Sequence, residues 1–299
     1  MSELFPAVDP SPSAAQRPGG AAPTDTSLLR VMSFNVRFGL ADDGPNNWDH
    51  RKDLLVRTIR RYDPDLLGVQ EALDFQMDVL RRALEGYGVV GAGRDDGKNR
   101  GEFSAVLFRT DRFEKLDEGH FWFSDRPHVP GTKHWDSELP RMCSWVMLRD
   151  RHARPGAGRD RVMFLDTHWD HAGTLARVES ARMLRQKIFD LHAYGPAVLV
   201  GDFNCTEDDE PYHELLRGGE GTGIKLVDAY RALHPQRQAA EATFHAFRGG
   251  REGSRIDWVI HTDDLQPIEA TIDHHHENGR YPSDHYPVTA VLAWKNQKG

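Results

Sequence analysis

Polar residues that can bind a metal ion or move a proton follow several short apolar runs of this chain. The clearest such run ends in Gly201-Asp202-Phe203-Asn204. Side chains two residues apart in an extended chain point the same way, so Asp202 and Asn204 would face one cleft while Phe203 turns to the core. A carboxylate and an amide suit a hard cation with oxygen ligands, together with a phosphate oxygen. An Asx turn after a strand explains the same residues about equally well.

Glu71 and His168 occupy comparable places farther up the chain. Glu71 follows the apolar run 65–70, where we expect it to open a helix. It is either a magnesium ligand or a carboxylate that the helix dipole favours at that position. His168 ends the strand predicted over residues 162–167, where it would stabilise or protonate phosphate oxygens in a transition state.

A second histidine stands in Ser283-Asp284-His285, just before the last apolar run. An unperturbed imidazole has a pKa of about 6.5, so His285 is a candidate general base on a water molecule. A base histidine needs a partner on its other ring nitrogen, and Asp257 is the candidate for that role. A turn residue beside an ordinary histidine is the competing explanation for this motif.

The elements that must position these residues can be read from hydrophobic periodicity. Helices are predicted over 51–62, 72–84 and 175–191, where apolar residues recur at helical spacing. The strands outnumber the helices, which favours two packed sheets flanked by helices, a layered α/β sandwich in one domain. Strands are predicted over 28–36, 65–70, 87–92, 103–109, 143–148, 162–167, 196–203, 255–260 and 288–294.

Composition narrows the class of protein. The net charge of −8 argues against a protein that mainly binds duplex nucleic acid through a basic surface. The two cysteines, Cys143 and Cys205, form neither a disulfide framework nor a CxxC pair, so they are expected to be small buried residues. No apolar run is long enough to span a bilayer.

The first 27 residues are rich in Pro, Ala, Ser and Gly and lack the pattern of a secretory signal. We expect a disordered tail over 1–27, a single domain over 28–299, and a cytoplasmic protein.

The order of the motifs, Ser-Phe-Asn, Gln-Glu, Thr-His, Gly-Asp-Phe-Asn, Ile-Asp and Ser-Asp-His, resembles the endonuclease/exonuclease/phosphatase superfamily over residues 28–294. The segments 47–52, 101–103 and 281–285 are similar to a bacterial branch related to CCR4/nocturnin-type enzymes. The resemblance implies a DNase I-like, four-layer α/β sandwich in which two mainly antiparallel or mixed sheets are flanked by helices. It also implies a phosphoesterase that depends on Mg²⁺ or Mn²⁺.

The resemblance further implies a role for each motif residue. Asp202 and Asn204 would orient or activate water and bind phosphate, and His168 would contact the scissile phosphate. Asp257 would orient His285. The metal site would contain Asn35, Glu71 as the principal ligand, and Asp284.

The substrate is less defined than the chemistry. A small phosphorylated molecule or a nucleic-acid end fits the acidic charge, and a sequence-nonspecific nuclease is the alternative. A catalytically silent binding module and a zinc hydrolase are the other rivals, but the chain has no HExxH pattern. No membrane association and no obligate protein partner are expected.

Three further features have ambiguous roles. Arg141 is either a phosphate contact or, more commonly for its type, a surface arginine. The run 274–277 is expected to be a solvated loop near the site entrance. Several aromatic residues either stack on a base or sugar or anchor the core: Trp48, Phe121, Trp122, Trp135 and Trp169.

Overall fold

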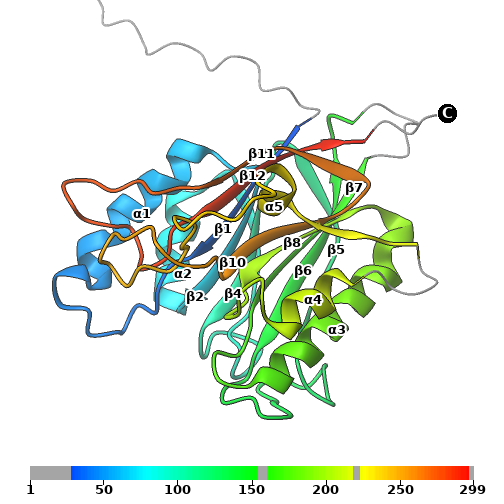
Figure 1. Ribbon diagram of the computed structural model, residues 1–299, viewed down its shortest axis with the longest axis horizontal. Coiled ribbons are helices and arrows are strands. Elements are labelled where there is room, and N and C mark those ends of the chain that lie inside the picture. The colour runs from blue at the N-terminus through cyan, green and yellow to red at the C-terminus, as the bar shows by residue number, and fades with distance from the viewer. Residues whose placement is uncertain (1–27, 154–159, 218–222, 296–299) are drawn as a thin grey trace, which may run out of the picture.

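Two six-stranded sheets pack face to face in the computed structural model, which describes residues 28–153, 160–217 and 223–295. The predicted tail over 1–27 lies outside the described residues. Helices α1 and α2 cover one side of the sheet pair and α3 and α4 the other (Figure 1). The four-layer sandwich expected from the sequence is therefore confirmed.

The first sheet has the strand order β11-β12-β1-β2-β4-β3. Its central pair β1 and β2 is parallel, whereas β12 and β4 run antiparallel to them on either side. Its strands are β1 (Leu28–Asn35), β2 (Leu66–Ala72), β3 (Tyr87–Val90), β4 (Phe103–Arg109), β11 (Leu265–Ile272) and β12 (Val288–Trp294).

The second sheet has the order β5-β6-β7-β8-β10-β9 and a similar plan. A central parallel pair, β7 and β8, is flanked by the antiparallel strands β6 and β10. Its strands are β5 (Phe113–Trp122), β6 (Met142–Asp150), β7 (Arg161–His168), β8 (Ala197–Asp202), β9 (Leu226–Asp228) and β10 (Asp257–Thr262).

Three apolar clusters hold the layers together. One lies between the sheets and includes Val31, Val146 and Val200. A second joins α1 (Trp48–Tyr62) and α2 (Asp74–Ala83) to the first sheet. The third joins α3 (Thr174–Leu191) and α4 (Glu210–Leu216) to the second sheet, and it contains both cysteines, buried and free as expected. The short helices η1 (Gly44–Asn46), η2 (His192–Tyr194) and α5 (Ala229–Leu233) complete the described elements.

The strand directions bring the sequence motifs to one edge of the sandwich. The carboxyl ends of the parallel strands β1, β2, β7 and β8 lie at the same edge as the starts of their antiparallel neighbours β4, β10 and β12. The pairing of Asp257 with Asp202 and of Ser33 with Val288 shows this register directly. Residues at the ends of the parallel strands therefore lie next to residues that precede their antiparallel neighbours.

The sequence predicted the central strands and the edge strand β3, but it missed the other three edge strands. β5, β9 and β11 were not predicted, nor were α4 and α5. β5 carries charged residues on an exposed face, and β11 contains Pro267. Both properties are common in edge strands, where one side of the backbone has no sheet partner, and both weaken the apolar pattern.

Gly68 of β2 lies against the second sheet, two residues before Gln70. A Cβ atom added there would lie 2.2 Å from Cγ2 of Val200 and 2.5 Å from a carboxylate oxygen of Asp166, both in the opposite sheet. The contact has no room for a methyl group.

We predict that Gly68→Ala lowers the free energy of unfolding by about 1–3 kcal/mol because the extra methyl overpacks the inter-sheet contact. Urea denaturation followed by circular dichroism measures the change. Gly86→Ala is the matched control, since a Cβ there meets nothing within 4 Å. Equal stability of the two variants would contradict this account of the packing.

Candidate active site

A cleft of about 500 Å³ opens at the edge where the motifs meet. Two of the predicted site residues, Asn35 and Asp257, are buried and do not line the cleft. The predicted residues that line it are Glu71, Arg141, His168, Asp202, Asn204, Asp284 and His285. The structure thus brings together every residue that the sequence proposed for the site.

Glu71 reaches the cleft through a β-bulge. It lies within β2, where the pairing register shifts, and its backbone is left-handed with a φ of 65°. Its carboxylate accepts hydrogen bonds from Asn35 Nδ2 (2.9 Å) and from the backbone N–H of Phe38 (2.7 Å). The prediction that Glu71 opens a helix is wrong, because α2 begins three residues later at Asp74. The helix dipole therefore does not explain this carboxylate.

Asn35 links the two sheets through its side-chain amide. Nδ2 donates to Glu71 in the first sheet and to Asp202 Oδ2 in the second, both at 2.9 Å. Its Oδ1 accepts from the backbone N–H of Arg37. In this arrangement the Asn35 amide holds the two carboxylates at a fixed separation, while its side-chain oxygen is used in the adjacent turn.

Asp202 and Asn204 both line the cleft, but they do so without an extended chain between them. The strand ends at Asp202, and Asn204 has a φ of 47° with its backbone N–H donating to Asp202 Oδ1 (3.0 Å). The Asx turn is thus present, and the same-face argument from an extended strand is wrong. Phe203 is buried as expected, and it stacks on Trp258 with a centroid distance of 4.5 Å.

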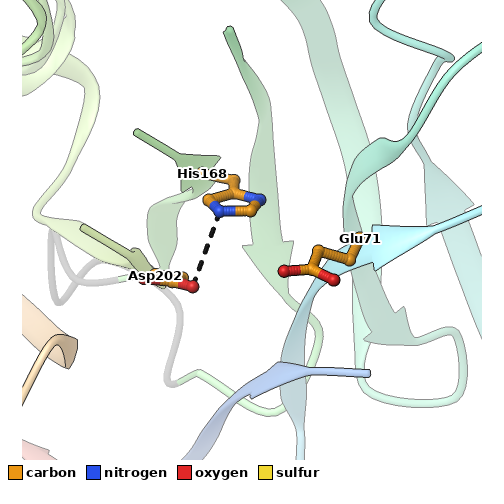
Figure 2. Close-up of side chains that lie close together, drawn as sticks. All are labelled: Glu71, His168 and Asp202. Atoms are coloured by element: carbon orange, nitrogen blue, oxygen red, sulfur yellow. Dashed lines mark ion pairs between the residues drawn. The ribbon is translucent and has the colours of Figure 1, made fainter. Parts of the chain in front are cut away.

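The two histidines flank the Asp202 carboxylate. His285 Nδ1 is 2.9 Å from Asp257 Oδ2, and its Nε2 is 3.7 Å from Asp202 Oδ2. His168 Nε2 is 3.5 Å from the same Asp202 oxygen and 2.9 Å from Asn204 Nδ2. Figure 2 shows Glu71, His168 and Asp202 pointing into a shared space. The pairing of His285 with Asp257 is the contact that the sequence predicted.

Burial and charge give these groups different protonation behaviour. Burial and the neighbouring Asp257 raise the pKa of Asp202 to about 7, against the opposing effect of His285. Burial alone would lower the pKa of His285, but Asp257 and Asp202 raise it well above the usual value. Burial and the charges of Arg141 and Arg94 lower the pKa of His168 well below its usual value. These shifts favour the protonated form of His285 and the neutral form of His168.

Arg141 is buried in the wall of the cleft, which corrects the expectation that it is a surface residue. Its Nη2 lies 3.2 Å from His171 Nδ1, whereas its Nε and Nη1 have no hydrogen-bond partner. Asp170 holds the preceding loop, since its carboxylate accepts from the backbone N–H groups of Glu138 and Leu139. The Arg141 guanidinium is therefore held within an anchored wall, with Glu102 3.8 Å from Nη1 and Asp170 3.9 Å from Nε.

Sequence reasoning missed several residues of the cleft. Glu102 lies in a segment that was noted only for its similarity to the family. Nothing in the sequence indicated Phe244, whose ring lies against that of His285. Conversely, no residue of the run 274–277 lines the cleft, so the expectation of a loop near the entrance is not supported. Four of the five aromatics proposed for stacking, Trp48, Phe121, Trp122 and Trp169, are buried in apolar clusters, and Trp135 packs against one.

The residues of the cleft fit a divalent cation. Glu71, His168 and Asp202 each offer one ligand atom, and these atoms lie within 4.8 Å of one another. Asp284 adds a buried carboxylate at the same cleft. Clustered carboxylate oxygens are the donors that Mg²⁺ or Mn²⁺ prefers.

Among the described helices, none combines the length and the apolar character that a membrane span requires.

Comparison with known proteins places the chain in a family. Residues 32–285 match the Endonuclease/Exonuclease/phosphatase family. Nocturnin of Drosophila melanogaster is 24% identical over 316 aligned positions, which cover 90% of this chain and 47% of that protein. Nocturnin of Mus musculus is 23% identical, covering 87% of this chain and 63% of that protein. The chain thus spans about half to two thirds of these curated relatives.

Solved structures agree with this assignment. An endonuclease/exonuclease/phosphatase family protein of Bacteroides thetaiotaomicron is 32% identical with a TM-score of 0.80, covering 90% of this chain and 98% of that one. A mannosyl-6-phosphatase of the same organism is 33% identical with a TM-score of 0.78, covering 89% of this chain and 100% of that one. The chain therefore belongs to the endonuclease/exonuclease/phosphatase family and has its DNase I-like fold.

Proposed function

We propose that this protein is a divalent-metal-dependent phosphatase that hydrolyses phosphomonoesters of small molecules. The observation that carries the proposal is the composition of one cleft. Carboxylates that suit a cation, Glu71, Asp202 and Asp284, line the same cleft as the buried Arg141. A cation and a guanidinium at one site are suited to the oxygens of a single phosphoryl group.

Three features support a small substrate. The cleft of about 500 Å³ matches a compact molecule. The net charge of −8 disfavours a long polyanion. A relative whose name specifies a phosphorylated sugar, the mannosyl-6-phosphatase, aligns over its full length at 33% identity. Hydrolysis of a nucleic-acid end is the second candidate, and similarity to the exoribonuclease subunit Ccr4 of Mycosarcoma maydis favours it, at 19% identity.

In the proposed mechanism the cation is held by Glu71 and Asp202, with Asp284 close by. When bound, the cation neutralises charge on the phosphoryl oxygens and on the leaving oxygen. Arg141, whose side chain lines the cleft, would donate to a non-bridging oxygen of the phosphate. These contacts place the phosphorus in front of Asp202.

We assign Asp202 to accept a proton from the attacking water, because its carboxylate lines the cleft between His168 and His285. His285 Nε2 is only 3.7 Å from Asp202 Oδ2, too close for the two to serve opposite faces of an in-line displacement. We therefore assign His285 the role of a cation that stabilises charge beside Asp202, in place of the base role expected from the sequence.

Metal removal and substrate choice test the proposal directly. We expect hydrolysis of p-nitrophenyl phosphate and hexose 6-phosphates to stop with EDTA and to return with Mg²⁺ or Mn²⁺. Activity on bis(p-nitrophenyl) phosphate and on labelled oligonucleotides should be much lower. Preferred cleavage of oligonucleotides would replace the phosphatase proposal with the nuclease, and restoration by Zn²⁺ alone would contradict the metal assignment.

Glu71→Gln should lower metal-dependent turnover by more than about 100-fold, since even the loss of an outer-shell partner of a metal site costs 10–100-fold. Steady-state kinetics and Mn²⁺ binding by calorimetry measure the two effects. Glu85→Gln, at an exposed position beyond α2, serves as the control for loss of one charge. Wild-type turnover in Glu71→Gln would remove Glu71 from the metal site.

Asp257→Asn should shift the alkaline limb of the pH–rate profile to lower pH. The pKa of His285 is raised by Asp257 and Asp202 against the effect of burial, so removing the Asp257 charge lets His285 lose its proton earlier. Because His285 acts protonated, activity then falls at lower pH than in the wild type. An alkaline limb that stays in place would contradict the imidazolium role.

A further inference from the structure

Glu102 occupies a fixed position at the wall of the cleft. It precedes β4 and follows Gly101, whose φ of +82° and whose contact with Asp95 allow no side chain. The backbone N–H of Arg94 donates to the carbonyl oxygen of Glu102 (3.0 Å), and Gly93 forms a bridge with Phe103. The turn between Gly93 and Gly101 therefore holds Glu102 and Arg94 side by side.

One oxygen of the Glu102 side chain faces three groups of the site. Oε2 accepts a hydrogen bond from Arg94 Nη1 at 2.6 Å. The same oxygen lies 3.8 Å from Arg141 Nη1 and 3.8 Å from His168 Nδ1. Only 14% of the side chain is exposed, so these interactions are poorly screened by water.

The distances suit an orienting role toward Arg141. At 3.8 Å the carboxylate attracts the guanidinium but does not form a hydrogen bond with it. Arg141 Nη1 and Nε accordingly keep their donors unused, although the residue is 96% buried. The Glu102 charge also separates two arginines, Arg94 and Arg141, that would otherwise repel each other in the same wall.

His168 is oriented from both ends of its ring. Nε2 accepts from Asn204 Nδ2, which places the ring proton on Nδ1, the nitrogen that faces Glu102. A carboxylate beside Nδ1 favours this tautomer and this ring orientation. Glu102 thus acts on the imidazole and on the guanidinium at the same time.

We propose that Glu102 is a positioning residue that sets the orientation of the Arg141 guanidinium and of the His168 ring, so that Arg141 faces a phosphoryl group in the cleft. The inference rests on the proposed function for the identity of that group. Glu102 itself does not bind the phosphate, since two anions repel each other.

This repulsion separates positioning from a simple charge effect. A carboxylate that acts only through its charge weakens phosphate binding, so its removal should strengthen binding. A carboxylate that positions two donors has the opposite effect, because its removal lets Arg141 turn away. The sign of the change in affinity for inorganic phosphate therefore decides between the two.

The experiment measures binding of inorganic phosphate to the full chain by calorimetry, with EDTA and with Mg²⁺, for the wild type, Glu102→Gln and Glu102→Ala. Positioning predicts roughly tenfold weaker binding and a turnover lower by on the order of tenfold to a hundredfold. Glu118→Gln is the matched control, an exposed glutamate that pairs with Lys115 far from the cleft. Tighter or unchanged phosphate binding in Glu102→Gln would overturn the proposal.

Two additions cover indirect effects. A double-mutant cycle with Arg141→Met should show coupling, since Glu102 acts partly through Arg141, and additive losses would refute that route. Arg94→Gln breaks the same ion pair from the other side and should weaken phosphate binding similarly if the Glu102 variants fold poorly. Phosphate binding is measured without turnover. The test of Glu102 therefore remains informative even if the wild type hydrolyses no phosphomonoester and the proposed function fails.

Discussion

Several ionisable groups are buried together at one edge of this sandwich, where water screens the interactions between their charges only weakly. Asp202 lies at the centre, between His168 and His285 and within reach of the Asn35 amide. Burial and Asp257 raise its pKa to about 7, and the two carboxylates in turn raise the pKa of His285. A cation at the cleft would relieve the excess of negative charge, which is the physical link between the fold and metal-dependent chemistry.

The rest of the structure keeps these groups in place. Parallel strand pairs in each sheet deliver Asn35, Glu71, His168 and Asp202 to one edge, and antiparallel neighbours return Asp257 and His285 to it. Because residues of both sheets contribute, the site depends on how the sheets pack. The tight contact at Gly68 fixes that packing a short distance below the cleft.

The opposite wall of the cleft has a different electrostatic character. Arg141, Arg94 and Glu102 form a buried group whose net charge is positive, and Arg141 retains unused donors. In the proposed function, one wall would hold the cation and the other would bind the phosphate. They also explain why a chain of net charge −8 can attract a phosphate locally.

The sequence by itself determined many of the residues that meet at the site, because each motif follows or precedes a central strand whose apolar pattern is strong. It also determined the layered fold and the partnership of His285 with Asp257. Only the tertiary structure decided that Glu71 lies on a bulge, that Arg141 is buried, and that Glu102 faces Arg141 and His168. Strand patterns are local, whereas pKa values and ion pairs arise between residues tens to hundreds of positions apart, whose distances no local pattern encodes.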